Sequence, residues 1–111
     1  MDLGLDVREV AERRAVLAVS GRLNAVTVPV LKARIKELVG LGRVELVCDL
    51  TGVGFLDSSG LAALVTGLKA VRERDGFLRL SGMNEQVAKI FKLTMLDRVF
   101  DVYPNSEAAL A

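Results

Sequence analysis

Two hydrophobic periods follow one another along this chain, and their order restricts the possible folds to a small set. Leu3, Leu5 and Val7 alternate with polar or small residues, and this period of two is typical of a half-buried strand. A polar turn at 12–14 separates them from a second strand-like run, Ala15–Val19. Because the connection is so short, the two strands are predicted to form an antiparallel hairpin.

Helical and strand-like stretches then alternate to the end of the chain. Apolar residues at helical spacing cover 28–39, 61–71 and 87–91, strand-like runs cover 44–50, 77–80 and 99–103, and a last helical turn begins at Pro104–Asn105. Each helical crossover returns the following strand parallel to the one before it. The sequence therefore predicts a single α/β domain over residues 1–111, with a mixed sheet and helices packed mainly on one face.

Glycines and capping residues mark the expected ends of these elements. Gly21 is expected to end the second strand, and Gly52 and Gly54 are expected to form a loop after the third. Thr27 and Asn84 precede helical periods, and their side chains are of the kind that caps a helix. The strand ends are therefore predicted to form the functional rim of the sheet.

The residue types that the chain lacks exclude several kinds of chemistry. No histidine is present and Cys48 is the only cysteine, which excludes imidazole metal sites, Ser-His-Asp triads and an internal disulfide. The 15 basic and 14 acidic residues give a net charge of +1, so no strong field attracts nucleic acid. No apolar run approaches the roughly 20 residues of a membrane span, and no signal peptide is recognised at the start. A cytoplasmic protein without a cofactor is expected.

Two patterns in the sequence resemble enzyme motifs, but their residues support an enzyme only weakly. Gly52-Val53-Gly54 begins like a dinucleotide-binding GxGxxG motif, but Asp57 stands where the third glycine would be, and its carboxylate would repel a pyrophosphate. Asp49 and Asp57 both lie near one predicted strand end and in principle form a pair for acid–base catalysis. The simpler interpretation is that Asp49 ends a strand and Asp57 shapes a loop.

The segment Phe55–Leu61, with the sequence FLDSSGL, is the most informative part of the chain. Asp57, Ser58 or Ser59 can cap the helix that is predicted to begin near Gly60. A serine at the start of a helix has a second property, because a phosphate on it carries about −1.5 to −2 charges beside the positive helix end. The fold would tolerate this state while the surface changed strongly, so both a simple cap and a phosphorylation switch fit these residues.

Four stretches of the sequence together resemble the anti-sigma factor antagonist family, whose fold is the STAS domain. They are GRLN at 21–24, DLTGV at 49–53, FLDSSGL at 55–61 and KLTMLDRVF at 92–100, and they occur in the order of the family. The resemblance covers nearly the whole chain and implies one STAS domain over residues 1–111. It also implies a binding module and not an enzyme.

The resemblance gives roles to the residues around the start of the second helix. In this family the domain binds an anti-sigma factor that is also a serine protein kinase, and this binding frees the sigma factor. The kinase phosphorylates the first serine after the signature aspartate, here Ser58, which breaks the association, and a metal-dependent serine phosphatase restores it. Asp57, Ser59, Gly60 and Leu61 are then expected on the docking surface around this serine.

Asn24 departs from the pattern of the family. The turn after the second strand belongs to the family's partner surface, and many members have an aspartate where this chain has Asn24. Asparagine keeps the size and an acceptor oxygen but loses the charge, so a charge-assisted contact to the partner would weaken. Asn24 is still expected on the docking surface, and the assignment of Ser58 as phosphoacceptor does not depend on it.

Two other functions stay open at this point. One is a scaffold, a STAS domain that assembles with other STAS domains in a larger signalling complex and in which Ser58 is only a cap. The other is an enzyme, either a weak nucleotidase or a receiver-like phosphoacceptor, although the chain lacks the acidic pair and the late lysine of a receiver.

The leading prediction is a monomer or weak homodimer that binds neither nucleic acid nor membrane.

Overall fold

A β-hairpin begins the described part of the chain, which covers residues 3–111 of the computed structural model. β1 (Leu3–Glu9) and β2 (Arg14–Leu23) pair antiparallel, as predicted. Along β1, alternate side chains from Leu3 to Val7 are half-buried and pack against the core, while the residues between them are exposed. The hairpin therefore forms one edge of the sheet.

The remaining elements alternate between helices and strands, as the periodicity predicts. They are α1 (Val28–Gly40), β3 (Glu45–Leu56), α2 (Ser58–Arg72), β4 (Phe77–Ser81), α3 (Glu85–Leu93), a 3-10 turn at Leu96–Arg98, β5 (Asp101–Tyr103) and α4 (Ser106–Leu110). Five strands form a sheet in the order β1-β2-β3-β4-β5. All neighbours after the β1–β2 hairpin are parallel, which confirms the predicted mixed sheet.

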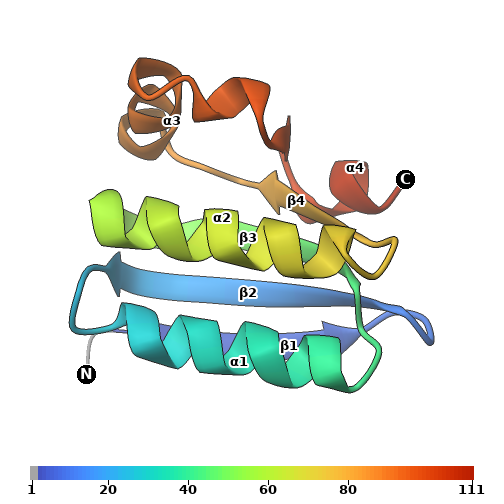
Figure 1. The fold of residues 1–111 in the computed structure, drawn as a ribbon. Coiled ribbons are helices and arrows are strands. Elements are labelled where there is room, and N and C mark those ends of the chain that lie inside the picture. Colours follow the sequence, from blue (N-terminus) through green and yellow to red (C-terminus); the bar gives the residue numbers. More distant parts are fainter. Residues whose placement is uncertain (1–2) are drawn as a thin grey trace.

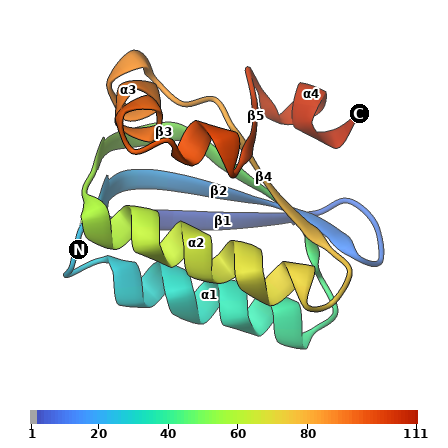
Figure 2. The same ribbon diagram turned by 45° about the horizontal axis from the view of Figure 1, so that its top comes forward.

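The helices α1 and α2 lie side by side across one face of the sheet (Figures 1 and 2). Leu31 and Ile35 of α1, together with Leu64 and Leu68 of α2, are buried in the main core beneath them. Full burial of each such side chain contributes about 1.5–3 kcal/mol, so this layer fixes both helices firmly on the sheet. The start of α2 is thereby held at the end of β3.

The short helix α4 packs on the opposite face of the sheet. Val16 and Val47, which alternate with core residues along β2 and β3, contact Ala109 there in a second small cluster. Arg79 Nη1 donates a hydrogen bond to the carbonyl oxygen of Ala109 at 2.7 Å, and a cation at the C-terminal end of a helix is favourable. The helices thus pack mainly, but not entirely, on one face.

Several expected element ends are wrong, and each error concerns a glycine or polar residue inside a strand. β2 continues past Gly21, which adopts φ 101° beside a shift in the β2–β3 register and does not end the strand. Gly52 and Gly54 lie inside β3 and not in a loop, and Asp49 lies inside it as well. A Cβ on residue 52 would be 2.7 Å from Cβ of Ser20, so Gly52 serves the close approach of β2.

Candidate functional site

The loop after β2 and the start of α2 meet at one end of the sheet, where two parallel strands stop together. Leu23 and Leu56 are the last paired residues of β2 and β3, and the N–H of Asp57 donates to the carbonyl oxygen of Leu23 at 3.1 Å. The carboxyl ends of parallel strands are the usual place for binding sites in α/β folds. The structure therefore brings together the two segments that contain Asn24 and Ser58.

Asp57 is the residue that caps α2. Its backbone is extended, with φ −109°, and its Oδ1 accepts hydrogen bonds from the N–H groups of Ser59 at 2.9 Å and Gly60 at 3.2 Å. Its carboxylate also stands at the positive end of the helix dipole. Of the three capping candidates the structure selects the aspartate, and α2 begins at Ser58, two residues before the expected start.

Ser58 is exposed at the first position of α2. Since Asp57 supplies the cap, the Ser58 hydroxyl takes no part in it, and within residues 3–111 this hydroxyl forms no hydrogen bond. A group attached to the hydroxyl would lie beside the positive end of the helix and would break no existing contact. This side chain is therefore available for modification without damage to the fold.

The three residues after Ser58 are all less exposed than Ser58 itself. Ser59 is half-buried, Gly60 is buried, and Leu61 is only 8% exposed. A Cβ on residue 60 would lie 3.0 Å from Cβ of Leu23 and 3.1 Å from Cγ of Leu56. Gly60 thus allows α2 to start directly against the ends of β2 and β3, and Gly60 and Leu61 lie beneath the exposed Ser58.

Asn24 organises the loop in front of α1. Its Oδ1 accepts hydrogen bonds from the N–H groups of Val26 at 3.0 Å and Thr27 at 3.1 Å. The predicted Thr27 cap is wrong, because the Thr27 hydroxyl is turned back into the loop and donates to the carbonyl oxygen of Arg22 at 2.6 Å. An aspartate in place of Asn24 would accept the same two bonds, so asparagine changes the charge of the loop and not its conformation.

Two exposed apolar side chains at this end of the sheet escape the sequence patterns. Val26 is 77% exposed in the loop before α1, and Phe55 is 40% exposed near the end of β3. The Arg22 guanidinium lies over the Phe55 ring, 4.6 Å from its centroid. The sequence could have pointed to Val26, because it is an apolar residue that belongs to no hydrophobic period. The exposure of the Phe55 side chain becomes evident only once β3 is known to extend past Gly54.

Asp49 and Asp57 do not form a catalytic pair. Asp49 lies inside β3 and Asp57 directly after its end, eight positions further along the chain, which is about 26 Å at roughly 3.3 Å per residue. Partial burial alone would raise the pKa of Asp49, but hydrogen bonds from the hydroxyl and N–H of Thr51 and from Ser106 outweigh burial and lower that pKa. Asp49 therefore acts as a charged acceptor inside the fold.

Other groups with chemical potential are buried or isolated. Cys48 is fully buried in β3, and burial raises the pKa of its thiol to about 12. Across residues 3–111 no three or more Asp, Glu, Cys or His side chains lie together in a way that could hold a metal ion. In the same described range, no helix has the length and apolarity needed to cross a membrane.

The class of this domain follows from its fold, and comparison with known proteins makes it specific. A family model described as the STAS domain matches residues 7–109, so the chain belongs to the STAS domain family. The anti-sigma-B factor antagonist of Bacillus subtilis (strain 168) is 27% identical over 110 residues, which is 99% of each chain. A protein of the same name from Listeria monocytogenes is 26% identical over 92% of this chain and 90% of its own.

Solved structures agree with this assignment. The crystal structure of an anti-sigma factor antagonist from Mycobacterium paratuberculosis matches with a TM-score of 0.86 and 30% identity, over 97% of this chain and 91% of the other. The Bacillus cell fate determinant SpoIIAA in its phosphorylated form shares the fold, with a TM-score of 0.74 and 19% identity over 95% and 96% of the two chains. The predicted resemblance to the anti-sigma factor antagonist family is confirmed.

Proposed function

We propose that this protein is an anti-sigma factor antagonist that binds an anti-sigma factor with serine kinase activity and is switched by phosphorylation of Ser58. The unphosphorylated domain binds the anti-sigma factor and thereby releases the sigma factor. Phosphorylation of Ser58 ends this binding, and a metal-dependent serine phosphatase restores it. The names of the Bacillus subtilis and Listeria relatives support the antagonist role, and we expect the protein to act in the cytoplasm with its partners.

One observation carries the proposal for Ser58. Ser58 is exposed at the start of α2, and its hydroxyl is not needed as the helix cap, because the Asp57 carboxylate accepts the two N–H groups of the first turn. A kinase can therefore reach this oxygen, and a phosphate on it replaces no structural hydrogen bond. Phosphorylation is expected to change the surface and to leave the sheet and helices as they are.

The surroundings of Ser58 suit binding in the unmodified state. Val26 and Phe55 expose apolar surface at the same end of the sheet, and apolar and aromatic side chains are typical of interface centres. The polar loop of Asn24 lies at this end as well and adds no charge of its own. A small uncharged hydroxyl permits close packing of a partner against these groups.

A phosphate on Ser58 would oppose the same contact. It would add about −1.5 to −2 charges next to the Asp57 carboxylate and would have to lose its water when a partner docks. A cost of about 3 kcal/mol for this desolvation and repulsion corresponds to a loss of affinity of about a hundredfold. Blocking at the surface is thus sufficient, and no change of fold is required.

Capture of partners from the native lysate tests this function. The wild type, Ser58→Ala and Ser58→Asp are used as baits, and the bound proteins are identified by mass spectrometry. Ser58→Ala should retain an ATP-binding kinase, and Ser58→Asp should lose it. Ala33→Asp, which places the same charge at an exposed position of α1, is the matched control and should bind like the wild type.

Two outcomes of this experiment count against the switch. Equal capture of the kinase by all three Ser58 baits would show that the charge at this position does not control binding. Capture of other STAS proteins in large assemblies, with no kinase and no phosphate on Ser58, would support the scaffold function instead.

A further inference from the structure

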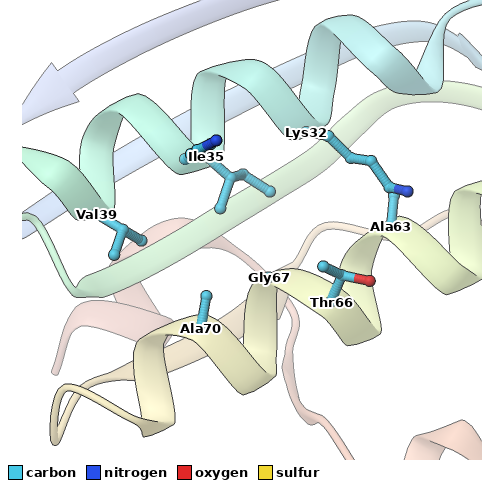
Figure 3. A pocket seen from close by; sticks show the side chains of 8 residues that line it. Lys32, Ile35, Val39, Ala63, Thr66, Gly67 and Ala70 are labelled. Carbon is cyan, nitrogen blue, oxygen red and sulfur yellow. The ribbon is translucent and has the colours of Figure 1, made fainter.

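A narrow groove of about 300 Å³ runs between α1 and α2 on the outer side of the helix layer. Figure 3 shows Ile35 and Val39 of α1 pointing toward α2, and Thr66 and Ala70 of α2 pointing back toward α1. Ala63 and Ala70 give the α2 wall only methyl groups at these positions. The space between the helices is open because no long apolar side chain of α2 enters it.

Gly67, in the middle of this wall, does not leave a gap that a larger residue would fill. A Cβ on residue 67 would lie 3.2 Å from Cδ1 of Ile35 and 3.2 Å from Cδ1 of Leu78. Gly67 therefore faces the packed core and fixes the close approach of the two helices. The open part of the groove lies outside it, between the side chains of α1 and the alanines of α2.

The charged residues that line the groove are all positive. Lys32 and Lys36 of α1 line it, and no acidic residue does. In Figure 3 the Lys32 side chain extends across from α1 toward Ala63. The hydroxyl of Thr66 donates to the carbonyl oxygen of Ala62 and is thus already engaged within α2. An occupant with an apolar body and one negatively charged end would complement these walls.

The size of the groove limits the shape of that occupant. One turn of an α-helix with its side chains fills more than about 400 Å³, so a helix of a partner protein would remain mostly outside a space of about 300 Å³. A group of the size of a water molecule takes up about 30 Å³, so the groove holds on the order of ten such groups. An unbranched chain of methylene groups fits this volume and the straight course between the two helices.

We propose that the groove between α1 and α2 binds a linear medium-chain fatty acid, with the acyl chain between the helices and the carboxylate beside Lys32 and Lys36. The groove begins about one turn of α2 beyond Ser58 and ends about three turns beyond it. The proposal is independent of the proposed function, because neither the hydroxyl of Ser58 nor any partner enters the argument.

Titration with a series of fatty acids tests the apolar part of this proposal. Hexanoate, octanoate, decanoate and dodecanoate are added below their micelle concentrations, and binding is followed by isothermal titration calorimetry and by heteronuclear NMR shifts. Each added methylene should raise the affinity about fourfold until the groove is full, after which the affinity should level off. Shifts should concentrate on the two helices at the groove.

Two sets of variants locate the site and test its charge. Ala70→Leu fills the groove and should reduce decanoate affinity by at least about tenfold, whereas Ala33→Leu, at an exposed position outside the groove, should not. The double variant Lys32→Gln with Lys36→Gln should weaken decanoate binding about threefold to tenfold at low salt and should leave the binding of neutral decanol unchanged.

Three results of these binding experiments would overturn the fatty-acid site. These are the absence of saturable decanoate binding to the wild type, equal binding by Ala70→Leu, or equal loss of decanoate and decanol affinity in the lysine variant. A dimer in solution whose contacts cover the groove would likewise show that a second copy, and not an acyl chain, is its occupant. Far-UV circular dichroism of each variant confirms that the fold is retained.

Discussion

Replacement of Asp57 by alanine tests how the start of α2 is held and, with it, whether the Ser58 hydroxyl is free. The substitution removes the acceptor for the N–H groups of Ser59 and Gly60, at 2.9 and 3.2 Å. An N-cap side chain contributes typically about 1 kcal/mol and at most about 2 kcal/mol. Since Ser59 is half-buried and Gly60 is buried, water replaces the carboxylate poorly, and we expect a loss of about 1–2 kcal/mol.

The measurement is the free energy of unfolding in urea, followed by far-UV circular dichroism at neutral pH. Asp57→Asn keeps an acceptor oxygen and should lose less than about 0.5 kcal/mol. Ser58→Ala removes a hydroxyl without a hydrogen bond and should also change stability by less than about 0.5 kcal/mol. If Ser58→Ala destabilised the protein as much as Asp57→Ala does, the serine would be the cap, and its availability for phosphorylation would be refuted.

Three further predictions concern residues near or beneath the site. Gly60→Ala should cost about 1–3 kcal/mol of stability in the same urea assay, because the new methyl group would lie 3.0 Å from Cβ of Leu23, and unchanged stability would show that α2 can move away from β2. The buried Cys48 thiol, with its pKa raised to about 12, should react with Ellman's reagent at pH 8 no faster than the protein opens, and immediate reaction would contradict its burial. Because the pKa of Asp49 is lower in the folded protein than in the unfolded chain, its hydrogen bonds stabilise the fold at pH values above the unfolded pKa, near 3.9, and this contribution is lost as the pH falls through the folded pKa. Asp49→Asn should therefore reduce the change of the free energy of unfolding with pH below about pH 4. If this pH dependence were the same as in the wild type, Asp49 would not have this role.

The order of elements is predictable from the sequence because each element carries its own hydrophobic period. The half-buried strand at Leu3–Val7 and the amphipathic helices show their periods locally, and no tertiary information is needed to recognise them. The strand ends are not predictable in this way. Gly21 and Gly52 are usual signs of a strand end, yet here both strands continue: Gly21 lies beside a shift in the β2–β3 register, and Gly52 allows the close approach of Ser20.

The candidate site shows the same division between local and tertiary information. The sequence locates Ser58 and Asp57 at a helix start, but three residues there can cap a helix, and only the three-dimensional structure shows that the aspartate accepts the N–H groups. Thr27 also has the chemistry of a cap, but its hydroxyl does not cap α1, because it donates to the carbonyl oxygen of Arg22 instead. The exposure of Phe55 depends on the length of β3, which the sequence pattern does not give.

The affinity of the protein for its anti-sigma kinase, before and after modification of a single oxygen, tests the proposed switch most directly. The kinase captured by the Ser58→Ala bait is purified, the wild-type domain is phosphorylated to completion, and the modified residue is confirmed by mass spectrometry. Calorimetric titration should then give an affinity at least about a hundredfold lower for the phosphorylated domain, with heteronuclear NMR changes confined to residues 57–61 and their neighbours. Equal affinity of the two forms, or a phosphate found on Ser59 with Ser58 unmodified, would contradict the proposed switch.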